Sequence, residues 1–293
     1  MRIDRLAVWL NTIGWRSADL VALAKRVEDW GYGTLWINDG MGSDPMVLAA
    51  RLLAGTDRLQ VAVGVANIYS RDPTTMIGAQ YGLNEQWSGR FLLGMGVSHA
   101  PIVEGLRGHV YAKPLATMRA YLEAMAAIDY PEPRPAEKPL TVIAALGPKM
   151  LELARTAADG VHPYATTPDH TAMAREIVGP GKLLLVEQKV MLETDAEKAR
   201  AAGRALVAGL TRLPNYRNSF LRMGFTEADL AEGVSDRAAD AMLAWGDEQA
   251  IRARIQQHWD AGADQVAIQV IPKEGGLLAR DDEALIELLA PSA

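Results

Sequence analysis

The chain has 293 residues and no cysteine, and this absence excludes several kinds of chemistry together. Disulfide frameworks, thiolate nucleophiles, zinc sites with cysteine ligands and iron–sulfur clusters all need that residue. A chain without disulfides is typical of a reducing compartment, so we expect a cytoplasmic protein.

The chain also lacks an excess of basic residues. Its 30 Lys and Arg residues face 36 Asp and Glu residues, which gives a net charge of −6 at pH 7. A surface that holds a nucleic-acid backbone needs a concentration of positive charge. We therefore expect no nucleic acid among the partners.

Long uncharged hydrophobic runs are missing as well. No uncharged stretch reaches the about 20 residues that a membrane-spanning helix needs. Residues 1–10 carry an acid and two arginines before a short apolar run. The sequence therefore predicts neither membrane insertion nor export.

Hydrophobic residues nevertheless make up 49% of the chain, enough for a sizeable core. Short apolar runs typical of strands alternate with amphipathic stretches typical of helices. Ser17 is predicted to cap the first helix, and Asp44 or Ser43 the second, which has Pro45 at its first position and Val47 facing the core. Strands are predicted at residues 3–10, 34–37, 59–66, 90–95, 140–145, 160–164, 183–192 and 266–271.

Eight strands, each followed by a helix, predict an α/β fold of the (β/α)8 TIM-barrel type that spans residues 1–293 as a single domain. Residues 213–245 are more chain than a connecting helix needs, so we expect an insertion between strands 7 and 8. The proline-rich residues 131–139 are interpreted as a surface connection, because the strand–helix period resumes directly after them. A doubly wound parallel sheet is the alternative.

The predicted strands end in polar residues, and the reacting groups of a parallel barrel lie at these ends. His99 and His162 could each exchange a proton near neutral pH, or serve only as hydrogen-bonding groups. Trp9 could line a pocket for a flat ligand or simply pack. Tyr216, in the insertion, could belong to a substrate lid or to a solvated loop. Asn11, Asn38, Asp39, Asn67 and Ser98 complete the polar set.

Several catalytic arrangements are not supported. The five histidines form no His-x-His and no His-x-x-x-His pair, so we expect no catalytic metal. The glycines of residues 94–96 do not continue into a dinucleotide-binding fingerprint. Ser98, His99 and Asp39 could be drawn as a triad, but the strand-to-helix serine motif of hydrolases is absent.

The turn formed by Leu146, Gly147, Pro148 and Lys149 stands at a predicted helix start, where free N–H groups and the helix dipole favour an anion. A plain strand-to-helix turn with proline in the first helical position is the alternative. This short pattern does not decide between the two.

Five segments together resemble the luciferase-like oxidoreductase superfamily, in its branch that uses the deazaflavin coenzyme F420. They are WGYGTLWIND, LQVAVGVANIYSRDP, GRFLLGMGVSHAP, AALGPKMLELARTAADGVHPY and AGADQVAIQV, in this order along nearly the whole chain. The resemblance implies a barrel of this type, a cofactor at the C-terminal mouth of the barrel and often a homodimer.

The resemblance also implies residues for the cofactor. Members commonly carry a bulge with a cis non-prolyl peptide in strand three, here at Val63, Gly64 and Val65. Asp39 and Asn67 would contact the pyrimidine edge or nearby ring atoms, and Gly96, Val97 and Ser98 would flank the ring. The turn at Leu146, Gly147, Pro148 and Lys149 would receive the phosphate-bearing tail. Substrate contacts are then expected from Trp9, Asn11, Asn38, His162 and Tyr216.

One departure concerns the acid/base groups. The F420-dependent sugar-phosphate dehydrogenases have a histidine after the strand-two aspartate and a glutamate after strand four, where this chain has Gly40 and His99. His99 is therefore our catalytic candidate in a hydride transfer between C5 of F420 and a small organic substrate other than a sugar phosphate. An FMN-dependent monooxygenase and a cofactor-binding protein without turnover are the alternatives.

Overall fold

A closed ring of parallel strands forms the centre of the computed structural model, which describes residues 1–40, 43–131 and 133–291. The ring closes because β10 pairs with both β1 and β8, in register from Leu6 opposite Val266 and from Gln265 opposite Leu185. The ring strands are β1 (Leu6–Leu10), β2 (Thr34–Ile37), β3 (Gln60–Val63), β5 (Phe91–Gly96), β6 (Thr141–Ile143), β7 (Gly160–Val161), β8 (Leu183–Leu192) and β10 (Gln265–Val270). Closure confirms the TIM barrel, and the doubly wound alternative is wrong.

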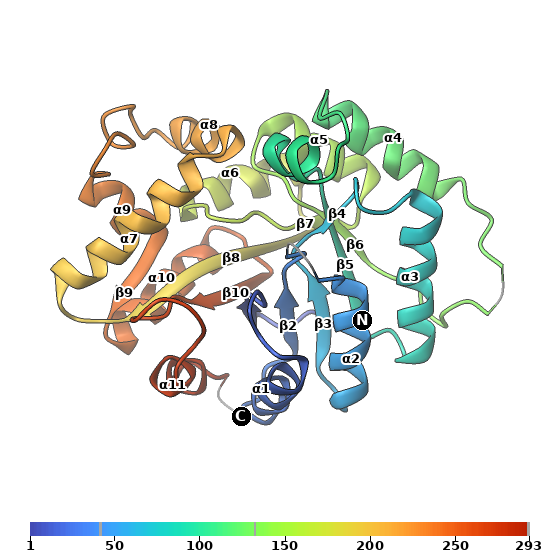
Figure 1. Ribbon diagram of the computed structural model, residues 1–293, viewed down its shortest axis with the longest axis horizontal. Helices are drawn as coiled ribbons and strands as arrows, with labels where there is room; N and C mark the ends of the chain where they lie inside the picture. Colours follow the sequence, from blue (N-terminus) through green and yellow to red (C-terminus); the bar gives the residue numbers. More distant parts are fainter. Residues whose placement is uncertain (41–42, 132, 292–293) are drawn as a thin grey trace.

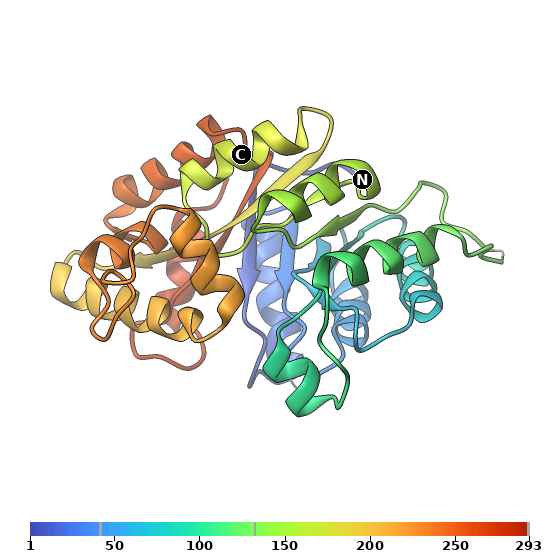
Figure 2. The same cartoon turned by 90° about the horizontal axis from the view of Figure 1, so that it is seen from above.

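Helices surround this ring (Figures 1 and 2). They are α1 (Ser17–Asp29), α2 (Pro45–Gly55), α3 (Pro73–Gln86), α4 (Pro114–Ala126), α5 (Pro148–Ala157), α6 (Pro168–Val178), α7 (Ala196–Thr211), α10 (Glu248–Asp260) and α11 (Arg280–Leu288). A short π-helix, η1 (Pro101–Leu106), follows β5. The described residues around the proline-rich stretch, 131 and 133–139, form neither helix nor strand, and residue 132 lies outside the described range.

The local starts of these helices follow from side-chain caps. Asp44 accepts hydrogen bonds from the N–H groups of Met46 and Val47, as the sequence predicts for the start of α2. Two details differ. The residue before α1 is Arg16, so Ser17 is the first helical residue and not its cap. Val47 is 69% exposed, because the buried face of α2 is formed by its neighbours in the turn.

The core of the barrel has two parts because successive strand residues point to opposite faces. One face packs against the helices. The other fills the barrel with small and aromatic side chains, which are Ala7, Trp9, Trp36, Ala62, Leu92, Val142, Leu185 and Ala267. Trp9 therefore points into the barrel, whereas Val63 belongs to the layer between barrel and helices.

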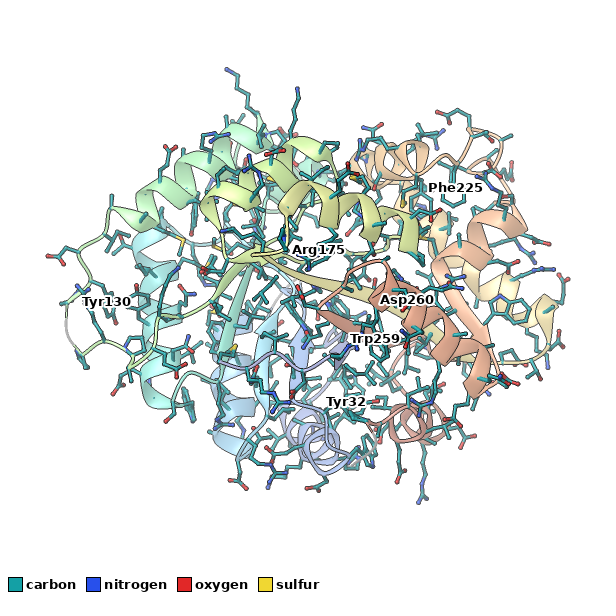
Figure 3. All side chains as sticks on the ribbon, turned by 180° about the vertical axis from the view of Figure 1, so that it is seen from behind. Tyr32, Tyr130, Arg175, Phe225, Trp259 and Asp260 are labelled. Atoms are coloured by element: carbon teal, nitrogen blue, oxygen red, sulfur yellow. The ribbon has the colours of Figure 1, made fainter. Side chains whose placement is uncertain are left out.

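Arg175 ties three segments together on the side seen in Figure 3. Its guanidinium donates to the carbonyl groups of Gly179, Lys182 and Gly262 and forms an ion pair with Asp264 at 2.6 Å. These contacts join α6 to the loops that precede β8 and β10. The contacts support barrel closure because β8 and β10 are the pair that completes the ring.

The predicted third strand is interrupted in the structure. A cis peptide bond joins Gly64 and Val65, and the two-residue strand β4 (Ala66–Asn67) then pairs with β5. The expected strand 59–66 is therefore two strands with a bend between them. Val65 lies at the bend and faces the C-terminal mouth of the barrel.

The insertion contains α8 (Pro214–Arg222), α9 (Asp236–Met242) and a strand that the sequence does not predict, β9 (Leu243–Gly246). Since Lys189 and Val190 of β8 already pair with β10, β9 occupies the opposite edge, which β7 leaves after residue 184. In Figures 1 and 2 the helices α7, α8 and α9 lie together at the left.

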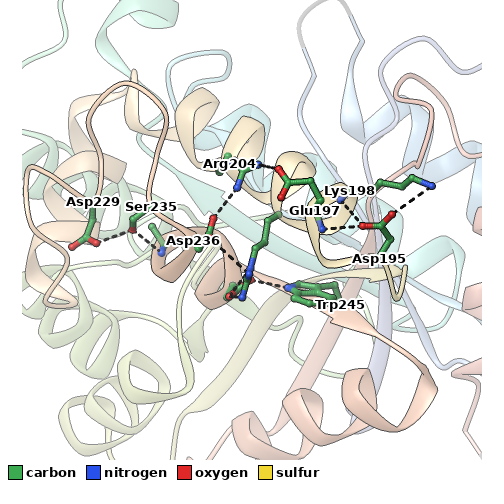
Figure 4. A network of polar contacts seen from close by, with 11 residues as sticks. Asp195, Glu197, Lys198, Arg204, Asp229, Ser235, Asp236 and Trp245 are labelled. Carbon is green, nitrogen blue, oxygen red and sulfur yellow. Dashed lines mark hydrogen bonds and ion pairs between the residues drawn. The ribbon is translucent and has the colours of Figure 1, made fainter.

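Ion pairs hold α9 against α7 (Figure 4). Arg204 pairs with Asp236 at 2.7 Å, and Arg200 pairs with Asp240 at 2.9 Å. Asp240 also accepts a hydrogen bond from the indole of Trp245 in β9. The insertion is thus fixed to the last third of the barrel.

Candidate active site

The C-terminal mouth of the barrel contains a crevice made of two connected hollows, with volumes of about 220 Å³ and about 350 Å³. It lies at the strand ends where the sequence predicts a site. The hollows share a common wall formed by Val65, Gly96, Ser98, His99, Ala144, His162, Tyr164 and Tyr216.

Glycines allow the bend after β3 to pack closely below this crevice. A Cβ atom on Gly96 would lie 2.5 Å from Cγ2 of Val65, and one on Gly94 would lie 2.2 Å from the carbonyl oxygen of Val63. A Cβ on Gly64 would meet Trp9, Trp36 and His162 at 2.8 to 3.0 Å. The strands therefore approach more closely than any other residue would permit, and Val65 becomes an apolar platform in the crevice.

His162 presents a hydrogen-bond acceptor at this platform. Its Nδ1–H donates to the carbonyl of Leu185 at 2.7 Å, because a carbonyl can only accept, and its ring stacks on Trp36 with centroids 4.0 Å apart. Burial lowers the pKa of His162 to about 4, so the ring is neutral at physiological pH. Its Nε2 and the Nε1 of Trp9 are buried without a partner among the described residues. Both side chains line the first hollow.

His99 is held by the insertion. Its Nδ1–H donates to Oδ1 of Asn215 in α8 at 2.9 Å, and its ring lies 5.5 Å from that of Tyr216. In the neutral ring, Nε2 is therefore the atom that can accept a proton. Partial burial lowers the pKa of His99 below its ordinary value. His99 lines both hollows, so the geometry suits a proton-transfer role.

Asp39 and Asn38 form one end of the first hollow. The Asp39 carboxylate accepts the N–H of Asn67 at 2.9 Å and lies 3.8 Å from the guanidinium of Arg71. Burial outweighs these contacts and raises the pKa of Asp39. Asn38 accepts from the N–H and the hydroxyl of Thr12, both at 2.8 Å.

The turn after β6 forms the other end of the crevice. Leu146 and Gly147 line the second hollow, and the carbonyl of Leu146 accepts a hydrogen bond from Nε2 of His170 at 2.9 Å. A guanidinium nitrogen of Arg222, from the end of α8, would lie 3.6 Å from a Cβ placed on Gly147. A cation and the free N–H groups of α5 thus meet at one place.

The predicted site residues are distributed as follows. Trp9, Asn38, Asp39, Asn67 and Val97 each line one of the hollows, in addition to those of the common wall. Asn11 is exposed and accepts the N–H of Ile13, and Val63 packs toward the helices. Pro148 and Lys149 are exposed on α5 and line neither hollow.

Six polar lining residues have no counterpart among the predicted site residues, namely Arg107, Tyr111, Tyr164, Asn215, Asn218 and Arg222. Tyr164 ends the predicted strand 160–164, three residues beyond the observed end of β7, and could have been included by the strand-end rule alone. The others come from the segment after η1 and from the insertion. No local pattern in the sequence places them at the mouth.

A buried ion pair supports Tyr164. Lys189 pairs with Glu187 at 2.9 Å, and its ammonium lies 3.7 Å from the centre of the Tyr164 ring. The Tyr164 hydroxyl donates to Gln269 at 2.9 Å. Lys189 at the ring face and Gln269 at the hydroxyl therefore fix the position of Tyr164.

Within the described residues, no group of three or more His, Asp or Glu side chains is arranged to hold a metal ion. No helix in the described part of the chain is both long and apolar enough to cross a bilayer.

Comparison of the sequence with known families identifies the family. The model of the luciferase-like monooxygenase family matches residues 4–265. The chain belongs to this family. The resemblance found in the five sequence segments is thereby confirmed, and the chain is a member of a family of enzymes.

Two curated relatives align with most of the chain. A Mycobacterium tuberculosis protein named "Putative coenzyme F420-dependent oxidoreductase" is 25% identical over an alignment 344 positions long, which covers 96% of this chain and 97% of that protein. A 5,10-methylenetetrahydromethanopterin reductase of Archaeoglobus fulgidus is 27% identical over 294 residues, 85% of this chain and 88% of the reductase.

A solved structure with the same architecture is that of an F420-dependent secondary alcohol dehydrogenase in complex with an F420-acetone adduct. It has a TM-score of 0.79 at 13% identity and covers 98% of both chains. This likeness establishes the shared fold.

Proposed function

We propose that the chain is an F420-dependent oxidoreductase acting on a small organic substrate. When bound, the deazaflavin would exchange a hydride at C5 with the substrate. The proposal rests on one observation above all, the apolar platform of Val65 with its glycine cradle in the crevice. The names of the two relatives and of the alcohol dehydrogenase support the choice of cofactor.

The residues of the crevice fit a flat, polar-edged ring with an anionic tail. Gly64, Gly94 and Gly96 keep side chains away from the platform, and Asp39 and Asn67 offer polar groups at one edge. At the far end, Leu146, Gly147 and Arg222 would receive the phosphate of the tail. The unpartnered Nε1 of Trp9 and Nε2 of His162 provide one donor and one acceptor for polar groups of a ligand.

The chain itself would supply position and a proton. The walls formed by Tyr164 and Tyr216 would restrict the substrate and exclude water. The Nε2 of His99, oriented by Asn215, would give or take the proton that accompanies oxidation or reduction.

Titration of the purified protein with F420 and, separately, with FMN tests this function, by absorbance and fluorescence in both redox states. We expect micromolar binding of F420 and much weaker binding of FMN. The reverse preference, with oxygen uptake in the presence of reduced FMN, would replace the proposal by an FMN-dependent monooxygenase. Tight binding of F420 without turnover on a broad substrate panel would instead indicate a binding protein.

An Arg222→Gln variant tests the tail contact. It should weaken F420 binding by about 10- to 100-fold, since a charge-assisted contact contributes about 1.5–3 kcal/mol. Lys149→Gln is the matched control because Lys149 is exposed on the neighbouring helix and lines neither hollow. Equal losses in the two variants would contradict the assignment of Arg222.

A further inference from the structure

Arg107 occupies an unusual position at the end of the first hollow. It follows η1, lines the hollow together with Asn38, Asp39 and His99, and is partly buried. Among the described residues that line this hollow, it is the only lysine or arginine. Its Nε is buried and has no hydrogen-bond partner.

The neighbouring charges are already paired with one another. Arg71 forms ion pairs with both Asp44 and Asp39, and the Asp39 carboxylate also accepts the N–H of Asn67. The charge of Arg107 acts on Asp39 only through space, where it opposes part of the increase in the pKa of Asp39 that burial causes. No ion pair or hydrogen bond joins the Arg107 guanidinium to a residue in the described ranges 1–40, 43–131 and 133–291. A buried donor without an acceptor costs free energy that a bound acceptor would recover.

Arg107 and Arg222 stand at different ends of the crevice. Arg222 lines only the second hollow, with Leu146 and Gly147, and Arg107 lines only the first. An anion at Arg107 therefore lies away from the turn that we assign to the cofactor tail. His99 is close in the chain, because its carbonyl accepts the N–H groups of Ile102 and Val103 at the start of η1. Both ends of this short helix thus contribute a side chain to one hollow.

We propose that Arg107 binds an oxyanion of the substrate, a carboxylate or phosphate group, and that the enzyme selects small organic acids. The guanidinium fork matches the two oxygens of such a group, and partial desolvation strengthens the contact. The substrate would be held between Arg107 and the wall formed by His99 and Tyr216. This inference rests on the proposed function for its reaction but not for the anion site itself.

The test is a calorimetric titration of the full-length protein, with and without F420. The probes are inorganic phosphate and two acid and amide pairs, lactate with lactamide and pyruvate with pyruvamide. We expect saturable binding of at least one anion, about tenfold or more tighter than the best neutral amide. Arg107→Gln should remove this preference, and Arg107→Lys should restore part of it because it restores the charge. The phosphate and carboxylate arms decide between the two anions.

Two controls separate this role from others. Arg119→Gln removes a charge from the exposed face of α4 and should leave anion binding unchanged. F420 affinity is measured for every variant. Anion binding by Arg107→Gln equal to that of the wild type, or no anion preference in the wild type, would overturn the proposal. So would a loss confined to F420 affinity, which would make Arg107 a cofactor residue. Failure of the wild type to bind F420 would refute the proposed function, while titration of the free protein would still decide the role of Arg107.

Discussion

At the scale of single residues, the two histidines of the crevice differ in what their rings can do. Both donate from Nδ1 and leave Nε2 unprotonated when neutral. His162 is 1% exposed and its pKa of about 4 keeps the ring neutral above pH 5. His99 is less buried, and its pKa is lowered from a value near neutrality. Of the two rings, that of His99 is the less buried, so His99 is our candidate for proton exchange.

Replacement of His99 by alanine should therefore lower kcat by about 100-fold, the usual contribution of a positioned acid or base. The limb of the pH–rate profile that titrates below about pH 6.5 should disappear, because burial lowers the pKa of His99. Steady-state kinetics from pH 5 to pH 8 measure both effects. His109→Ala, an exposed histidine, is the control. An unchanged rate and profile in the His99 variant would exclude its acid/base role.

Gly64 is the residue on which the platform depends. Gly64→Ala should destabilise the fold by about 1–3 kcal/mol, because the added Cβ would meet the buried rings of Trp9, Trp36 and His162 at 2.8 to 3.0 Å. Gly78→Ala, in α3 with no atom within 4 Å of the added Cβ, should raise stability by about 0.5–1 kcal/mol. Urea denaturation measures the free energy of unfolding of both variants. Equal values would contradict the inference that close packing requires glycine at position 64.

At the scale of the elements, the insertion completes the site. Its helix α8 supplies Asn215, Tyr216 and Arg222 to the crevice. The position of α8 depends on α7, which precedes it directly, and α9 packs on α7 through Gly203. A Cβ on Gly203 would already lie 3.0 Å from Cβ of Ala239. Close approach of the two helices is thus set by one glycine.

Gly203→Leu should separate α9 from α7, lower the free energy of unfolding by about 1–3 kcal/mol and weaken F420 binding. Gly209→Leu is the matched control, because it lies on the exposed side of α7 with nothing within 4 Å of an added Cβ. Chemical denaturation and F420 titration provide the two readouts. If both variants behaved alike, packing of α9 on α7 would not determine the geometry of the insertion.

At the scale of the whole molecule, stability should depend on pH through two buried histidines. Burial lowers the pKa of His162 to about 4 and that of His258 to about 3. As pH falls below about 6.5, the unfolded chain takes up protons that the folded chain excludes, so stability present above that pH is lost. The expected slope is about 1.4 kcal/mol per pH unit for each histidine between about pH 6 and pH 4.

Urea denaturation at pH 7, 6 and 5 measures this slope. His258→Gln should flatten it, because glutamine keeps a polar group opposite Gln188 and Thr171 but takes up no proton. The comparison with the wild type removes the contribution of the surface carboxyl groups. An identical slope in the variant would show that His258 does not control acid sensitivity.

The assembly is a further prediction at this scale. The family resemblance leads us to expect a homodimer through the helices after β2 and β3, near Trp87, and Val47 on α2 is 69% exposed. Light scattering should therefore give twice the mass of the chain, and Val47→Asp should shift it toward the monomer. Val110→Asp, at a 78% exposed position after η1, should not. A monomeric wild type would refute the expectation.

The sequence by itself determined the barrel fold and the position of the site at the C-terminal ends of its strands. Short apolar runs separated by amphipathic helical stretches indicate which segments are strands, and a parallel barrel then brings their polar ends to one mouth. For this reason Asp39, Asn67, Ser98, His99 and His162 could be predicted as neighbours across more than 120 residues. The bulge at Gly64 and Val65 came from the family resemblance.

Only the tertiary structure decided which side chains outside the strands reach the crevice. Arg107 directly follows η1, and Asn215 and Arg222 come from α8; the directions of these elements depend on contacts with distant elements and not on a local period. The same holds for β9, which forms because β8 extends beyond β7 and leaves an edge free. Lys149 and Val47 show the converse. The sequence predicts Lys149 in the cofactor site and Val47 in the core, but the orientation of their helices exposes both side chains to solvent.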